Sequence, residues 1–157
     1  MTRSVGIAPV HKTIRVKASH AHAFAVFTAG LGRWWPRTAT IGAGPLKIVV
    51  METRLGGCWY EESEDGSQAN VGKILVWEPP HKFVVSWDIN SNWKPDTMVS
   101  SEVEVRFIAD GSQSTVVELE HRKFEQMGAE AGASMRRDVD GGWPGILDEF
   151  KKAAETN

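Results

Sequence analysis

His121 is the residue whose type and position best suit acid–base or ligand chemistry. It ends an alternating stretch, residues 115–121, in which Val117, Leu119 and His121 share one face. In a strand, this phase turns His121 toward the apolar, concave side of a sheet. An imidazole there could contact a ligand or act as a general base, because its unperturbed pKa lies near neutrality. The alternative is a strand-end histidine that points into a loop or is hydrogen-bonded locally.

Three further residues could bind a metal or attack a substrate. His20 and His22 lie two positions apart in a predicted helix, so they do not share a face, and we expect no metal site. Cys58 follows two glycines at a strand start, with no identifiable basic partner. This position predicts a buried, inert thiol rather than a nucleophile. We expect neither a metal nor a cofactor.

Two clusters of charge admit different interpretations. The acidic run of residues 61–65 precedes a turn and is typical of a solvated hairpin end. Arg136 and Arg137 lie on the last predicted helix beside acidic residues. They either belong to an exposed polar face, or one of them reaches over a cavity mouth toward an anionic ligand.

The tryptophans stand out in the composition, with seven tryptophans against one tyrosine. They either fill the core or line one cavity, since small-molecule sites are mostly apolar with a few polar groups. Trp87 shares a strand face with Phe83 and Val85, and Trp143 leads an apolar helix stripe. Trp93 lies in a polar loop, where it could form a lid or part of a dimer contact.

Length and charge restrict the class of protein. The 157 residues predict a single domain, 1–157, with 41% hydrophobic and 24% charged residues. A net charge of −2 gives no attraction to nucleic acid or to an anionic membrane. No apolar run approaches the roughly 20 residues of a membrane helix, so we expect no membrane insertion. The lone Cys58 fits a reducing compartment, and we predict a cytoplasmic protein.

Periodicity predicts the elements that position these side chains. Polar and apolar residues alternate in several segments, and each turn or loop carries glycine, proline or aspartate. Ser19 is a candidate N-cap for the first of two short helices, which end near Gly30 and Pro36. The expected strands span residues 11–17, 47–53, 58–62, 71–77, 83–87, 99–108 and 115–121, and a final helix spans residues 129–156.

Two finer expectations follow from the same pattern. Strict alternation along residues 71–77 would put Val71 and Trp77 on one face and Ile74 on the other. In the final helix, Gly141, Gly142 and Pro144 predict a kink or a restart near Trp143.

The order of elements predicts an α+β protein. Six or seven antiparallel strands in mostly consecutive hairpins give a curved sheet, and the final helix must bury its apolar stripe against it. Such a sheet wrapped around one helix leaves a gap between them.

Four motifs in this order resemble the START-like (SRPBCC, helix-grip) superfamily. They are the strand and helix entry of residues 13–27, the Trp34-Trp35-Pro36 segment, the glycine-rich and proline-turn strands of residues 56–59 and 72–87, and Gly142-Trp143 on the final helix. The chain most resembles the family named for the activator of the 90-kDa heat-shock protein's ATPase. The resemblance implies a helix-grip fold and a cavity between the sheet and the C-terminal helix.

The fold and the tryptophan-rich faces favour a non-catalytic domain that binds a hydrophobic small molecule or a lipid. The expected lining residues are Trp35, Trp59, Trp87, His121, Met135 and Trp143. One alternative is a cyclase- or hydrolase-type enzyme with His121 as its base. The other is a protein-interaction module, either a homodimer or a stress-related chaperone partner. An exposed apolar patch around Trp93 or residues 34–36 would support it.

Overall fold

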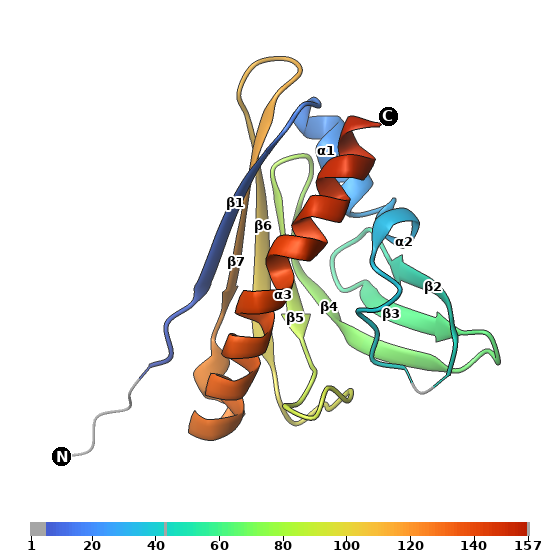
Figure 1. Cartoon of the computed structure of the whole chain (residues 1–157), viewed down its shortest axis with the longest axis vertical. Helices are drawn as coiled ribbons and strands as arrows, with labels where there is room; N and C mark the ends of the chain where they lie inside the picture. The colour runs from blue at the N-terminus through green and yellow to red at the C-terminus, as the bar shows by residue number, and fades with distance from the viewer. Residues whose placement is uncertain (1–5, 43, 157) are drawn as a thin grey trace.

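Seven antiparallel strands form one curved sheet in the computed structural model, which describes residues 6–42 and 44–156 (Figure 1). The strand order is β1-β7-β6-β5-β4-β3-β2, so every sheet neighbour except β1-β7 is also a neighbour in the chain. This arrangement confirms the α+β helix-grip fold predicted from the sequence. The strands are β1 (Val10–Val16), β2 (Leu46–Met51), β3 (Cys58–Ser63), β4 (Gln68–Glu78), β5 (Lys82–Trp87), β6 (Ser101–Ala109) and β7 (Thr115–Arg122).

The helices lie against the sheet (Figure 1). The short helices α1 (His20–Phe27) and α2 (Leu31–Trp34) follow β1, and a 3-10 turn, η1 (Phe124–Met127), precedes α3 (Ala129–Glu155). Ser19 caps α1 as predicted, since its hydroxyl accepts the His22 backbone N–H at 3.2 Å. Figure 1 shows α3 running obliquely across the sheet, with α1 at its C-terminal end and α2, β2 and β3 toward one side of it.

The α3 helix does not restart near Trp143, so one of the two expectations from the sequence was wrong, while a kink there stays a prediction. The helix continues through Gly141, Gly142 and Pro144 without interruption. These three residues are exposed, whereas the buried stripe lies on the opposite face. Tertiary burial of that stripe outweighs the poor helix propensity of the solvent-facing residues. The stripe consists of Gly132, Met135, Val139, Trp143, Leu147, Phe150 and Ala154.

Strict alternation fails in β4, because the strand contains two register shifts. Trp59 pairs with Gly72 and Tyr60 with Asn70, so Val71 is an extra residue. A second shift, between Ile74 and Val76, adds another residue opposite β5. Each bulge turns the following side chains to the other face. Val71, Ile74 and Trp77 therefore all join the core, although alternation had separated Ile74 from the other two.

Phenylalanines fill one end of the space between the sheet and α3. Phe27 contacts Phe150 of α3 with ring centroids 4.9 Å apart, and Phe24 contacts Phe107 of β6 at 5.2 Å. Phe83 of β5 packs against both Phe24 and Phe27. Such tilted and edge-to-face contacts stabilise a core by about 0.5–1.5 kcal/mol per pair beyond the burial of area. These phenylalanines fill the core between α1, β5, β6 and the C-terminal half of α3.

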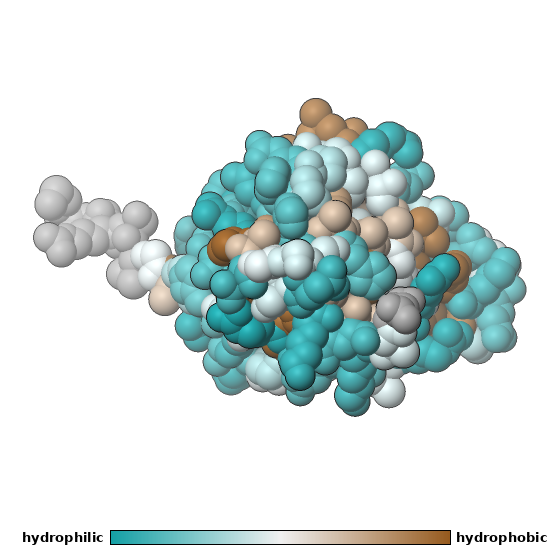
Figure 2. Space-filling model, turned by 90° about the horizontal axis from the view of Figure 1, so that it is seen from above, coloured by the Kyte–Doolittle hydropathy of each residue, from teal (hydrophilic) through white to brown (hydrophobic). Residues whose placement is uncertain are grey.

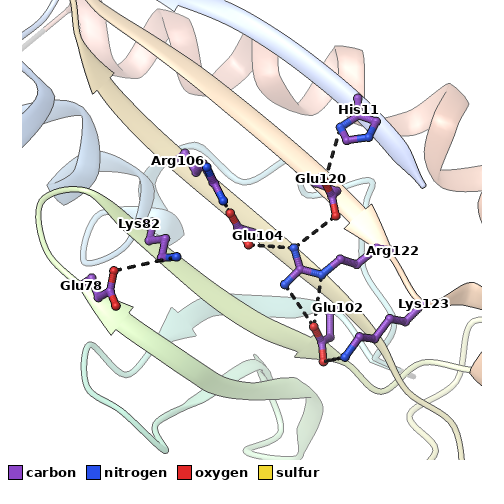
Figure 3. Close-up of polar contacts among 9 residues, drawn as sticks. All are labelled: His11, Glu78, Lys82, Glu102, Glu104, Arg106, Glu120, Arg122 and Lys123. Carbon is purple, nitrogen blue, oxygen red and sulfur yellow. Dashed lines mark hydrogen bonds and ion pairs between the residues drawn. The ribbon is translucent and has the colours of Figure 1, made fainter. Parts of the chain in front are cut away.

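The outer face of the sheet carries the charged residues that the alternation predicted (Figure 3). Arg122 bridges Glu104 at 2.7 Å, Glu120 at 3.2 Å and Glu102 at 3.2 Å. Burial alone would raise the pKa of Glu104, but the guanidinium groups of Arg122 and Arg106 hold that pKa below its ordinary value. This face is a network of mutually neutralising ion pairs.

Exposed apolar residues are scattered on the face shown in Figure 2, where hydrophobic atoms form separate spots among hydrophilic ones. Single exposed apolar side chains of this kind are normal for a globular protein. Among the described residues, no helix is both long enough and apolar enough to cross a membrane.

Candidate ligand-binding site

A cavity of about 280 Å³ lies between the middle of α3 and the strands β3 to β5. The segment after α2 and the loop between β5 and β6 complete its wall. The wall is mostly apolar and includes five of the seven tryptophans. The tryptophans are Trp35, Trp59, Trp87, Trp93 and Trp143, and the polar side chains in the wall are Thr38, Thr40, Glu61 and Asp138.

Four of these tryptophans form a closed ring of edge-to-face and tilted contacts. Trp35 contacts Trp59 with centroids 5.0 Å apart, and Trp59 contacts Trp87 at 5.7 Å. Trp87 contacts Trp143 at 5.7 Å, and Trp143 returns to Trp35 at 6.2 Å. The members come from the end of α2, from β3, from β5 and from α3, so the fold itself brings them together. We call this set the tryptophan ring.

The indole N–H groups in the wall differ in their partners. Trp35 donates to the Ala39 carbonyl at 2.9 Å, and Trp143 donates to Nδ1 of His121 at 3.1 Å. These bonds fix the orientation of both rings. The Trp87 Nε1–H is buried and has no hydrogen-bond partner among the described residues. A buried donor of this kind costs about 1–3 kcal/mol when it stays unpaired.

Glu61 of β3 provides a buried carboxylate in the cavity wall. Its residue is only 3% exposed, and its oxygens accept the Ile41 N–H at 2.9 and 3.0 Å and the Gly42 N–H at 3.0 Å. Burial raises the pKa of Glu61, and the two backbone donors partly oppose that rise. The sequence had suggested a solvated hairpin end. That interpretation was wrong for Glu61, which shares the buried face of β3 with Trp59 and Ser63.

Trp93 closes the cavity from the β5–β6 loop. Its ring stands edge-on to Trp87 with centroids 6.3 Å apart, and its Nε1 donates to Asp138 of α3 at 3.1 Å. The backbone of Trp93 has a φ of 60°, in the left-handed region that bulky residues rarely adopt. Such strain costs about 1–3 kcal/mol and persists only where the surroundings enforce it. Trp93 belongs to the cavity wall, and the lid and the dimer contact suggested by the sequence both stay predictions.

The structure brings together four of the six residues expected to line the cavity. They are the members of the tryptophan ring. His121 and Met135 are fully buried but do not belong to the cavity wall. His121 lies behind two ring members, with centroids 5.1 Å from Trp87 and 6.0 Å from Trp143. Strand phase predicted that His121 faces inward, but phase carries no information about depth.

Both ring nitrogens of His121 are engaged. An indole N–H can only donate, so Nδ1 of His121 accepts from Trp143 and Nε2 carries the proton. That proton is directed to the Ser101 hydroxyl at 2.9 Å. Burial lowers the pKa of His121 from 6.5 to about 3, and the imidazole is neutral. Its partners come from β6 and α3 rather than from its own strand end, so the locally hydrogen-bonded alternative was wrong. His121 is a core histidine that supports the tryptophan ring.

The two arginines do not reach the cavity mouth. Arg136 donates through Nε to the Ala8 carbonyl at 2.6 Å and so holds the segment before β1. Arg137 lies 3.4 Å from the Ser134 hydroxyl on the exposed side of α3. Neither belongs to the cavity wall.

Two further expectations concerned metal binding and the thiol. The ring of His20 stacks on that of His81 with centroids 5.7 Å apart. Among residues 6–42 and 44–156, no three His, Cys, Asp or Glu side chains are grouped to hold a metal ion. Cys58 is half-buried rather than buried, because it lies on the face of β3 opposite to the buried residues Trp59 and Glu61.

The family model described as "Activator of Hsp90 ATPase homolog 1-like protein" matches residues 17–155. The chain belongs to this family. The match confirms the resemblance drawn from the entry helix, the tryptophan segments and the proline turn. Comparison with curated proteins gives no significant match.

Two solved structures are similar to this family member in sequence as well as in fold. An anthrahydroquino-γ-pyrone synthase, Txn09, complexed with SUM, is 36% identical, with a TM-score of 0.65, covering 94% of this chain and 97% of that one. CalC from Micromonospora echinospora, a self-sacrificing resistance protein, is 32% identical, with a TM-score of 0.68 and 94% coverage of both chains.

A third structure shows the fold alone. The Aha1 dimer from Colwellia psychrerythraea is 18% identical, with a TM-score of 0.62, covering 95% of this chain and 97% of that one. For this family member, a homodimer and a chaperone partner stay predictions. The exposed apolar patch that would support them does not occur at Trp34 and Trp35, each of which is 7% exposed.

Proposed function

We propose that the cavity of the tryptophan ring binds a small apolar molecule with an aromatic ring system. The observation that carries this proposal is the set of four mutually packed tryptophans in the wall of one cavity of about 280 Å³. Flat indole faces suit a flat ligand, because aromatic pairs gain about 0.5–1.5 kcal/mol beyond area burial.

The size of the cavity favours a compact ligand over a long-chain lipid. Its volume is about 280 Å³. Small-molecule sites usually enclose roughly 300 to 1000 Å³, so this cavity lies at the lower end of the range. The 36% identity to a protein named as an anthrahydroquino-γ-pyrone synthase also supports an aromatic ligand with fused rings. The unpaired N–H of Trp87 would suit a carbonyl or hydroxyl oxygen on such a molecule.

The proposal predicts saturable binding of 1,8-dihydroxyanthraquinone and weaker binding of palmitate. The seven indole N–H signals in a ¹⁵N–¹H NMR spectrum report the location of the ligand. We expect shifts for Trp35, Trp59, Trp87 and Trp143. Trp77, which packs against Phe24 outside the cavity, serves as the internal control.

A matched pair of variants tests the same prediction. Trp35→Leu should weaken anthraquinone binding about tenfold or more, because one face of the ring is lost. Trp77→Leu should leave the affinity within about twofold, since Trp77 lies outside the cavity wall. The proposal is refuted if the wild-type protein binds neither the anthraquinone nor palmitate.

A cyclase is the second candidate function, favoured by the same 36% identity. In this chain Glu61, rather than His121, is the buried acid–base group in the cavity wall. A suitable probe is 2-hydroxydibenzoylmethane, in which the phenol oxygen adds to the distal ketone and water leaves to give flavone. A cyclase would accelerate the ultraviolet change of this closure, and Glu61→Gln would remove the acceleration. A binding domain would leave the rate at its uncatalysed value.

A further inference from the structure

The charged side chains in the cavity wall are all acidic. Glu61 comes from β3 and Asp138 from α3, and no lysine, arginine or histidine belongs to the described wall. The remaining wall is formed by tryptophans, aliphatic residues and two threonines, together with small residues. A neutral apolar ligand would not stabilise two carboxylates in the cavity wall, so these carboxylates favour a ligand with positive charge.

Glu61 is a buried carboxylate without a countercharge. Within the described part of the chain, no basic group lies within ion-pair distance of it. A carboxylate offers about four acceptor positions, and Glu61 uses them for the N–H groups of Ile41 and Gly42 only. A buried charge usually has an ionic partner as well, because desolvation of an unpaired ion is costly. A positive group inside the cavity would supply that partner.

Asp138 stands at the mouth and is fixed in place. Its Oδ2 accepts the Trp93 indole N–H at 3.1 Å, and this hydrogen bond holds the carboxylate beside Trp93. The Asp138 side chain remains exposed, so it can meet a charged ligand at the entrance before that ligand loses its water.

The faces of the tryptophan ring favour a cation for an independent reason. An indole face carries negative potential, and tryptophan is the best side chain for cation–π attraction, which strengthens when the cation loses its water. Four indoles and two carboxylates around one cavity therefore select for positive charge as well as for an aromatic shape.

We infer that the cavity takes a positively charged aromatic molecule, an organic cation or amine, with Glu61 and Asp138 as its charge-recognising residues. This inference rests on the proposed function, because it names the ligand class of the same cavity. It differs from that proposal in requiring a preference between molecules of the same shape.

Two bicyclic probes of nearly equal size separate charge from shape, namely 1-methylquinolinium and 1-methylnaphthalene. Titration calorimetry should give about tenfold or tighter binding for the cation than for the neutral hydrocarbon. Asp138→Asn keeps an oxygen for the Trp93 N–H but loses the charge, and Glu61→Gln likewise keeps an acceptor for the loop. Each change should weaken binding of the cation about tenfold and leave the neutral probe within about twofold.

Asp140→Asn is the matched control, because it removes the same charge two residues from Asp138. Asp140 lies outside the cavity wall and pairs with Lys12 at 2.8 Å. It should leave both affinities unchanged. If Glu61→Gln does not fold, Asp138→Asn still decides the matter, because its side chain is exposed.

Equal affinity for the two probes, or loss of cation binding in Asp140→Asn as large as in Asp138→Asn, would overturn the inference. Binding of 1,8-dihydroxyanthraquinone would then still uphold the proposed function. Absence of binding by the anthraquinone, palmitate and both bicyclic probes would refute the two together.

Discussion

Gly72→Ala should destabilise the protein by about 3 kcal/mol or more, among the largest effects expected of a single methyl group. A Cβ atom built at Gly72 would lie 1.7 Å from the Ser86 carbonyl oxygen and 2.6 Å from its carbon. Both atoms belong to the backbone of β5, so neither can move aside as a side-chain tip would. Gly72 lies directly against β5 here, since the next residue, Lys73, donates its backbone N–H to the Ser86 hydroxyl at 2.9 Å.

Urea unfolding followed by tryptophan fluorescence measures this loss. Gly141→Ala is a control of opposite sign, because nothing lies within 4 Å of a Cβ at Gly141, on the exposed side of α3. Alanine there should stabilise the protein by up to about 1 kcal/mol through helix propensity. A Gly72→Ala protein whose unfolding midpoint equals that of the wild type would show that β4 and β5 can separate without loss.

The sequence predicted the strands that pair without bulges. In β6 and β7, apolar residues recur at every second position, and Val103, Val105, Val117 and Leu119 are all buried as that period requires. Unbroken antiparallel ladders keep the phase set by the sequence. Alternation failed in β4, because its two bulges arise from pairing with β3 and β5. The local sequence of β4 does not show that pairing.

The cavity was only partly predictable for a similar reason. Composition and phase pointed to the tryptophan ring, since large aromatic residues on inner faces must meet near the final helix. Glu61 was missed because its acidic neighbours suggested a solvated turn, although its spacing from Trp59 and Ser63 was a usable signal. Trp93 and Asp138 are 45 residues apart, and only the folded chain shows that they meet.

Mild acid should destabilise the protein through His121. The unfolded chain binds a proton at His121 near the ordinary pKa of 6.5, whereas burial keeps the folded imidazole neutral down to about 3. Between these values the unfolded state holds more protons, so stability decreases as pH falls, by about 1.4 kcal/mol per pH unit. From about pH 7.5 to about pH 5, the free energy of unfolding should therefore drop by about 2 kcal/mol from this group.

Urea unfolding at those two pH values, with two variants, assigns the effect to His121. His121→Asn keeps an oxygen that can accept the Trp143 N–H but removes the buried imidazole ring. The variant should be less stable than the wild type at neutral pH, because the smaller side chain leaves a gap. Its stability should change little with pH, because the titrating group is gone. His11→Gln changes a histidine whose side chain is 65% exposed, and it should retain the full slope. A slope in His121→Asn as steep as in the wild type would assign the acid sensitivity to other groups. A flat profile would instead assign the acid sensitivity to the buried imidazole behind the tryptophan ring, which the folded protein keeps neutral.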